Sequence, residues 1–156
     1  FITLFQKTLQ IPHLRCWITG DINDAARAEG EKLIKKTSVQ HEIARCRCEI
    51  EQCRLLTLQA AEIMDSEGVE AAMPYISMLK IVGPNMAQNV ADRAMQVFGG
   101  MGVCQDTLIP SVFTQARFCR IADGPDEVHR WRTGANVIKA FEEHGTTASA
   151  CGGELL

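Results

Sequence analysis

The sequence predicts an all-α domain, folded as an antiparallel four-helix bundle. Apolar side chains recur at three- and four-residue intervals along two long stretches, which is the pattern of one buried helix face. Glycine and proline stand at the ends of these stretches and leave room only for short connections. No stretch of four or more residues favours a β-strand by alternation of apolar and polar side chains.

The first helix is expected to begin at Thr37 and to stop at Gly68. Thr37 and Gln40 have the spacing of a capping box, in which two side chains satisfy backbone N–H groups at the helix start. The apolar face of this helix is predicted to consist of Ile43, Cys46, Ile50, Cys53, Ala60 and Met64.

The second helix is expected to begin near Val69 and to end at the glycine pair Gly99-Gly100. Pro74 lies in its first turns, where proline is tolerated, and Gly83-Pro84 is expected to kink it. Its apolar face is predicted to consist of Met73, Ile76, Val82, Met86, Val90 and Val97.

A glycine-containing loop is expected over 99–109, and a third helix from Pro110 to about Ile121. A fourth helix is expected to restart at Pro125, with acidic residues in its first turn, and to end at Gly145. The apolar face of the third helix is predicted to consist of Val112, Phe113, Ala116 and Cys119.

The chain of 156 residues is predicted to form one domain with an ordinary hydrophobic core. Residues 37–145 make up the predicted bundle. Residues 1–36 stay unassigned, because they follow no clear apolar period. Residues 146–156 are small and polar and are expected to be a mobile tail.

The composition excludes several classes of partner. A net charge of −3, without a basic stripe, argues against nucleic acid. No apolar run is long enough for a transmembrane segment, and no targeting signal is visible at the N-terminus. We therefore expect a soluble intracellular protein.

The seven cysteines include no C-x-x-C pair, which excludes common zinc and thioredoxin-like motifs. Cys46 and Cys53 are expected to share a helix face as buried thiols in a reducing compartment, whereas Cys48 should point elsewhere.

The turn at 96–102 contains Gly100 and Gly102 as a G-x-G, but position 105 is Gln105 and the turn follows a helix rather than a strand. It therefore fails as a dinucleotide-binding motif. Two interpretations remain: the bare backbone packs closely on a neighbouring helix, or it approaches a phosphate group.

The turn Asp123-Gly124-Pro125-Asp126-Glu127 places a carboxylate before a glycine and a helix N-terminus. Free N–H groups there can hold an anion or a carbonyl oxygen, so a base and an oxyanion site would be neighbours. The alternative is that Asp123 or Asp126 only caps the fourth helix. His129, a lone histidine, fits a surface or capping role better than a catalytic one.

The two turns, in this order at helix ends, resemble the paired signatures of the acyl-CoA dehydrogenase C-terminal domain. The turn reading A-D-G-P-D-E-V-H is most similar to the subgroup formed by family members 10 and 11. The likeness runs from about Ser38 to Val128 and includes the segments 54–58 and 60–61.

The resemblance implies FAD as the cofactor. Gln96, Gly99 and Gly100 would contact the ADP part of a flavin bound by a partner subunit, in a homodimer or homotetramer. The flavin of the same subunit would be bordered by Pro125, Asp126 and Glu127.

For the substrate, the resemblance implies that Asp123 is the carboxylate that removes the α-proton of an acyl-CoA thioester. Gly124 would lie against the thioester. The implied reaction is the α,β-dehydrogenation of fatty acid β-oxidation, in mitochondria or peroxisomes. Desolvation would have to raise the pKa of the base for this reaction, and Asp is one methylene shorter than the Glu that is common in the family.

The chain also departs from the family. Compared with the family, residues 10–36 read as an insertion between two segments that are normally adjacent. Ile2 stands three positions before Phe5, where the family has an arginine that grips flavin phosphates. The N-terminal helical and middle β-domains of the family have no counterpart in this sequence. The isolated chain is therefore expected to bind flavin weakly or not at all and to have no turnover.

The alternative from another class is a helical oligomerisation or interaction module without catalysis. A di-metal carboxylate bundle would need two Glu-x-x-His repeats, whereas the chain has only Asp126-x-x-His129. No metal site is expected.

Overall fold

The computed structural model describes residues 33–145, and this part of the chain is helical without any β-strand. Its elements are η2 (Leu33–Lys35), α3 (Thr37–Glu67), α4 (Val69–Phe98), α5 (Gly100–Val103), α6 (Ile109–Cys119) and α7 (Asp126–His144). The predicted all-α bundle is confirmed. The predictions for the N-terminal insertion, for Ile2 and for the tail at 146–156 lie outside the described residues.

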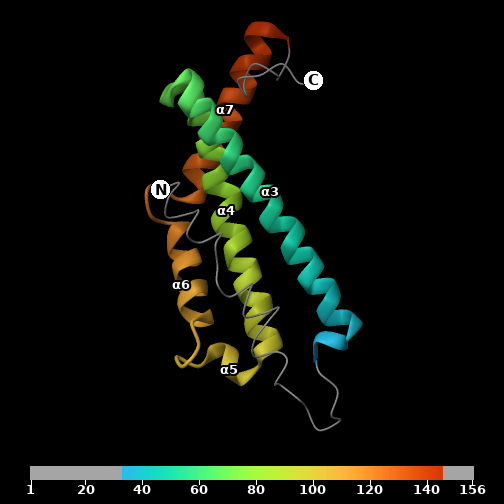
Figure 1. Cartoon of the computed structure of the whole chain (residues 1–156). Helices are drawn as coiled ribbons and strands as arrows, with labels where there is room; N and C mark the ends of the chain where they lie inside the picture. The colour runs from blue at the N-terminus through green and yellow to red at the C-terminus, as the bar shows by residue number, and fades with distance from the viewer. Residues whose placement is uncertain (1–32, 146–156) are drawn as a thin grey trace.

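Helix α4 is the centre of the bundle. It packs against α3 on one side and against α5, α6 and α7 elsewhere on its surface. In Figure 1, α3 and α4 run side by side in opposite directions, α6 lies on the other side of α4, and α5 closes the lower end. The loop between α6 and α7 therefore joins two helices that both pack against α4.

The long helices begin and end close to the predicted residues. Gly68 (φ 92°) separates α3 from α4, and Gly145 (φ 66°) ends α7 with its N–H donated to the Phe141 carbonyl. Helix α4 continues through Pro74 and Gly83-Pro84 without a break. Local sequence signals are enough here because helix ends depend mainly on nearby backbone groups.

The capping-box prediction at the start of α3 was wrong. The N-cap residue is Lys36, without a side-chain hydrogen bond, so Thr37 already lies within the helix. The Gln40 side chain instead donates to the carbonyl of Ile34 at 3.1 Å. This bond ties α3 to the preceding turn η2.

The loop expected over 99–109 is partly helical, because Gly100–Val103 forms the single turn α5. Helix α6 begins at Ile109, one residue before the expected Pro110, and ends at Cys119 rather than near Ile121. Helix α7 begins at Asp126, and Pro125 is its N-cap in extended conformation rather than its first helical residue.

The core lies mainly between α3 and α4, with one residue from α6. It comprises Cys46, Ile50, Cys53, Leu79, Met86, Val90, Ala94 and Ile109. The predicted face of α3 is therefore largely correct. Val82 of α4 was predicted to lie on the buried face but is 42% exposed. Helix α4 contacts α3, α5, α6 and α7, so its buried residues do not follow the single apolar face that the prediction assumed.

The cysteines of α3 follow the prediction: Cys46 and Cys53 are buried and Cys48 is exposed. Burial raises the pKa of the Cys53 thiol to about 11 and also raises that of Cys46. Near Cys46, the Arg93 guanidinium of α4 donates to both carboxylate oxygens of Glu49, at 2.6 and 2.9 Å. This bidentate pair joins α3 to α4 beside the core.

No helix within residues 33–145 combines the length and apolar character needed to cross a bilayer.

Candidate functional site

The loop at 120–125 joins α6 to α7 and has an unusual backbone. Within residues 33–145, Asp123 is the one non-glycine residue with a positive φ (55°), and Gly124 follows it with φ 99°. Asp123 is exposed, and its carboxylate has no hydrogen bond or ion pair with residues 33–145. The left-handed backbone thus places an exposed carboxylate, unpaired within residues 33–145, beside a residue without a side chain.

Neither aspartate caps α7, so the capping interpretation of this turn was wrong. Pro125 occupies the N-cap position, and no side chain bonds to the helix start. Asp126 cannot act as the cap because it is already the first helical residue. The N–H of Asp126 donates to the Arg120 carbonyl, and that of Val128 donates to the Pro125 carbonyl. Within residues 33–145, the N–H of Glu127 is therefore the one at the start of α7 that has no backbone acceptor.

The imidazole of His129 packs directly against Gly124. A Cβ built on Gly124 would lie 2.9 Å from His129 Nε2, which is closer than real Cβ contacts allow. The same nitrogen lies 3.3 Å from the carbonyl oxygen of Asp123, within hydrogen-bond reach. The positive φ therefore favours glycine at position 124, and the ring of His129 would have to move to admit a Cβ there.

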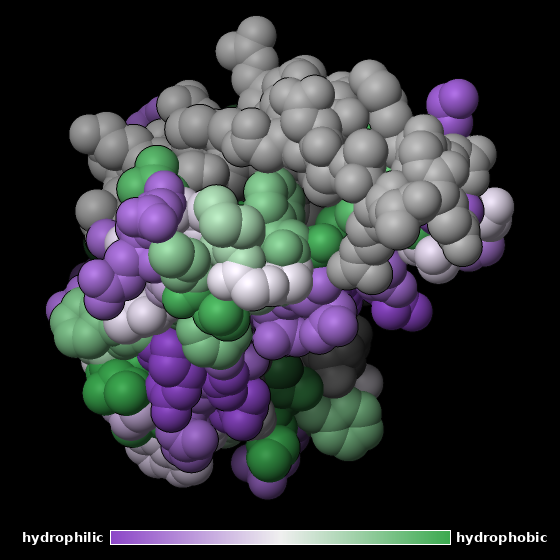
Figure 2. All heavy atoms as spheres, turned by 90° about the horizontal axis from the view of Figure 1, so that it is seen from below, coloured by the Kyte–Doolittle hydropathy of each residue, from purple (hydrophilic) through white to green (hydrophobic). Residues whose placement is uncertain are grey.

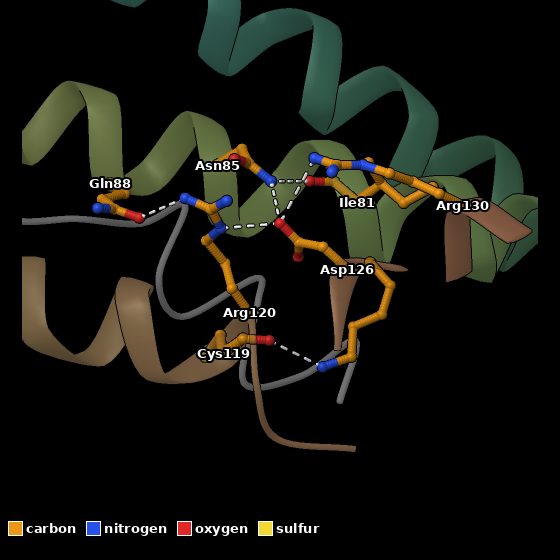
Figure 3. A network of polar contacts seen from close by, with 8 residues as sticks. Ile81, Asn85, Gln88, Cys119, Arg120, Asp126 and Arg130 are labelled. Atoms are coloured by element: carbon orange, nitrogen blue, oxygen red, sulfur yellow. Dashed lines mark hydrogen bonds and ion pairs between the residues drawn. The ribbon is translucent and has the colours of Figure 1, made fainter. Parts of the chain in front are cut away.

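Asp126 does not face the exposed side of the turn. Its side chain is 4% exposed, and its Oδ2 accepts hydrogen bonds from Arg120 Nε at 2.8 Å and Asn85 Nδ2 at 3.1 Å. Arg130 Nη2 lies 3.6 Å from the same oxygen (Figure 3). Burial alone would raise the pKa of Asp126, but the hydrogen bonds from Asn85 and Arg120 and the nearby positive charges outweigh it and lower this pKa.

The loop is also held by residues that the sequence analysis did not single out. Arg120 Nη1 donates to Gln88 Oε1 of α4 at 2.9 Å. The buried Lys80 of α4 donates to the carbonyl of Cys119 at 2.9 Å and to that of Ala122. A lysine between Leu79 and Ile81 was a usable signal, since a buried ammonium needs acceptors; Arg120 and Gln88 carried none.

The glycines of the 96–102 turn have different structural roles. A Cβ on Gly102 would overlap the Met95 carbonyl oxygen and lie 2.7 Å from the Met95 Cα, so close packing explains that glycine. Gly99 has φ 62°, and Gly100 has open space around it and an ordinary φ. The packing interpretation thus holds for Gly102, whereas nothing within the described chain requires glycine at 100.

The surface around this turn is mixed in character. Gln96 and Gly100 are exposed, and Met101 and Val103 of α5 are 54% and 63% exposed. Seen from the α5 end, green hydrophobic groups lie among purple hydrophilic ones (Figure 2). A surface of this kind can meet another macromolecule or a bulky polar ligand.

The structure does not bring the two predicted halves of the site together. The turn at 96–102 lies at one end of α6 and the Asp123 loop at the other (Figure 1). The 11 residues of α6 correspond to roughly 16 Å of helix. One chain therefore presents two separate surfaces, as expected if Gln96 serves a partner's cofactor.

Comparison with known proteins gives the same family for the whole domain. The profile of the acyl-CoA dehydrogenase C-terminal domain matches residues 22–138. Acyl-CoA dehydrogenase family member 10 of Mus musculus is 48% identical over 103 residues, which are 66% of this chain and 10% of that protein.

Solved structures share the fold. A putative acyl-CoA dehydrogenase from Mycobacterium abscessus superposes with a TM-score of 0.75 at 34% identity, covering 90% of this chain and 33% of that one. An FAD complex of PigA superposes with a TM-score of 0.74 at 22% identity, covering 86% and 34%. The second likeness shows the fold alone.

The chain thus spans about a tenth of the mouse relative and a third of the solved chains that it matches. The match over most of its length, together with the helical fold, shows that this chain belongs to the acyl-CoA dehydrogenase family and corresponds to its C-terminal domain.

Proposed function

We propose that this chain supplies the catalytic base and one wall of the flavin and thioester site of an acyl-CoA dehydrogenase, acting in fatty acid β-oxidation. The observation that carries the proposal is the exposed Asp123 carboxylate, which has no bonding partner within residues 33–145 and stands beside Gly124, two residues before α7 begins. The name of the mouse relative and the family match support the reaction class.

Asp123 would act as the base. The α-proton of a thioester is weakly acidic, so the carboxylate must be desolvated when substrate and flavin cover it. The pair of electrons released from the α C–H bond forms the α,β double bond as hydride leaves the β-carbon. Bound FAD would supply the hydride acceptor, and the product would be an enoyl-CoA.

Gly124 would let the thioester approach, because it has no side chain between Asp123 and the start of α7. The thioester carbonyl oxygen, on which negative charge develops, would then lie near the N–H of Glu127, which has no backbone acceptor within residues 33–145. The exposed Pro125 and Glu127 would border the flavin. The Asp126 side chain would not contact the flavin, since it is directed toward α4.

The residues of the second turn also fit this proposal. Gln96 is exposed, and the open space around Gly100 would let a flavin's ADP moiety lie on bare backbone. The family resemblance implies that the two surfaces would serve two different flavins, with Gln96 and Gly100 on the flavin of a partner subunit. A homodimer or homotetramer would therefore be the active form.

The decisive experiment uses a domain-exchange enzyme, in which residues 33–145 replace the corresponding region of the mouse relative. We expect this protein to bind FAD and to oxidise acyl-CoA with an external electron acceptor. Asp123→Asn should retain FAD but lose at least about 10³-fold in turnover, and it should stop α-deuterium exchange, because the base is gone.

Asp65→Asn is the matched control, since Asp65 is an exposed aspartate of α3 remote from the turn. It should leave turnover and exchange unchanged. Full turnover in Asp123→Asn would show that the base is another residue. A folded domain-exchange enzyme that binds no FAD would contradict the cofactor proposal.

The isolated chain is expected to retain no FAD after gel filtration and to have no turnover, because each of its two surfaces covers only part of a flavin. The absorbance spectrum of the purified chain tests this directly. Stoichiometric bound FAD would overturn it.

The second candidate is an oligomerisation module without catalysis. Helix α7 favours it by exposing Trp131, Ile138 and Phe141, at 73%, 62% and 58%. Sedimentation of the chain together with the Asp123→Asn assay separates the candidates: stable assembly with an active Asp123→Asn variant would favour the module.

The proposed reaction implies a mitochondrial or peroxisomal location. Fractionation of cells that express the natural protein would test this, and enrichment in another compartment would contradict it.

A further inference from the structure

The loop that carries Asp123 is closed by two contacts between the same pair of residues. The N–H of Asp126 donates to the carbonyl of Arg120 at 3.2 Å. In return, Arg120 Nε donates to Asp126 Oδ2 at 2.8 Å. The residues between them, 121–125, include both positive-φ positions, Asp123 and Gly124. The two contacts between Arg120 and Asp126 therefore hold together the two ends of the segment that contains Asp123 and Gly124.

Both members of this pair are also attached to α4. Asn85 donates to the Asp126 carboxylate at 3.1 Å and also to the Ile81 carbonyl of its own helix at 2.6 Å. Gln88, one turn further along, accepts from Arg120 at 2.9 Å (Figure 3). The loop is thus fixed to the central helix at both ends, by side chains that come from a different part of the chain.

The Asp123 carboxylate itself is left out of these bonds. Among residues 33–145 it has no hydrogen-bond or ion-pair partner, whereas its carbonyl oxygen lies near His129 and the adjacent Ala122 carbonyl accepts from Lys80. The backbone of the proposed base is therefore held, while its carboxylate has no bonding partner among residues 33–145. This is the arrangement expected for a base that must be aimed but not neutralised.

We propose that Asp126 is a positioning residue for Asp123, acting through Arg120 and Asn85, and that its side chain does not touch the flavin. The inference rests on the proposed function of Asp123. Burial of the Asp126 side chain to 4% exposure supports it, as does the direction of that side chain toward α4. The adjacent carboxylate of Glu127 is exposed by contrast, so the two acidic residues of the first turn have separate roles.

The first test needs no activity and uses the 156-residue chain. Asp126→Ala should raise the hydrogen-exchange rate of the amide at position 126 at least tenfold, because the loop closure loses its side-chain half. The Gly99 amide, which donates to Met95 at 3.0 Å, should be unaffected. An unchanged rate at position 126 would overturn the inference whether or not Asp123 is the base.

The second test uses the domain-exchange enzyme. Asp126→Ala should lower kcat on the order of 10²-fold, with KM for acyl-CoA and FAD content nearly unchanged, because a small displacement of the base affects the chemical step most. Asp126→Asn keeps an oxygen acceptor for Arg120 and should restore most of kcat. Loss of FAD in Asp126→Ala, or equal losses in the two variants, would overturn the positioning role.

Glu49→Ala is the matched control, because Glu49 also accepts a close hydrogen bond from an arginine but joins α3 to α4 away from the loop. It should change kcat less than about twofold, and a loss as large as that of Asp126→Ala would assign the effect to general stability.

Asn85→Ala is the variant to test if Asp126→Ala does not fold. It should lower kcat severalfold, and an unchanged kcat would overturn the inference. An active Asp123→Asn variant would instead refute the proposed function itself.

Discussion

The imidazole of His129 occupies the space that a side chain on Gly124 would need, since a Cβ at that position would lie 2.9 Å from His129 Nε2. Gly124 also has φ 99°, which L-residues rarely adopt. Two independent physical constraints, one on the backbone and one on packing, therefore act at the same position beside the proposed base.

Gly124→Ala should destabilise the chain by about 1–3 kcal/mol through backbone strain, and further through the contact with His129. In a His129→Ala background the contact is relieved and only the strain remains, so the loss should be smaller. Urea unfolding of the four variants in this double-mutant cycle measures the difference.

Gly134→Ala is the matched control, because Gly134 lies within α7 with nothing within 4 Å of an added Cβ. It should be stabilising by about 0.5–1 kcal/mol through helix propensity. A Gly124→Ala variant as stable as Gly134→Ala would show that the turn does not adopt this conformation in solution.

The stability of the chain should depend on pH through Asp126. Its pKa is lowered in the folded state, because the hydrogen bonds from Asn85 and Arg120 outweigh the effect of burial. A lowered pKa stabilises the folded state above the unfolded value of about 3.9, and this contribution is lost as the pH falls through the folded pKa. The difference in unfolding free energy between the natural chain and Asp126→Asn should therefore shrink below about pH 4.

Glu51→Gln serves as the comparison, since the hydrogen bond from Arg54 lowers the pKa of Glu51 at a partly exposed position. Solvent screening should make its effect on the unfolding free energy smaller than that of Asp126→Asn at every pH. A difference between the natural chain and Asp126→Asn that grows toward low pH would contradict the assignment.

The thiols of α3 should differ strongly in reactivity. Burial raises the pKa of Cys53 to about 11, so little thiolate forms near pH 8, whereas Cys48 is exposed on the opposite side of the helix. Iodoacetamide at pH 8, followed by peptide mass spectrometry, should label Cys48 first and Cys53 only after urea is added. Equal labelling of the two in the folded chain would mean that α3 is not packed against α4.

Two glycines of the 96–102 turn should respond differently to alanine. Gly102→Ala places a Cβ against the Met95 carbonyl oxygen and 2.7 Å from the Met95 Cα, and it should lower the Tm, because backbone must move. Gly100→Ala meets open space and should leave the Tm unchanged or raise it.

In the domain-exchange enzyme, Gly100→Ala should nevertheless weaken FAD binding, measured by flavin release on dilution. Unchanged FAD affinity would remove Gly100 from the cofactor site.

The sequence by itself determined the four longer helices and the positions of the two turns, but not the short elements η2 and α5. Gly68 and Gly145 marked helix ends correctly, and the spacing of Cys46 and Cys53 identified a buried face. These features depend on backbone hydrogen bonds and side-chain periods within a few residues, so a local pattern is enough to predict them.

Only the tertiary structure decided what each residue of the Asp123 turn does. Asp123 and Asp126 looked alike as acidic residues near a helix start, yet Asp123 is exposed and has no partner within residues 33–145, whereas Asp126 is buried against α4. The difference arises from Asn85, which is 41 positions from Asp126 in the chain and reaches it only because α4 and α7 pack together. No local pattern encodes a partner at that distance, so the division between an outward base and an inward anchor became visible only in the packed bundle.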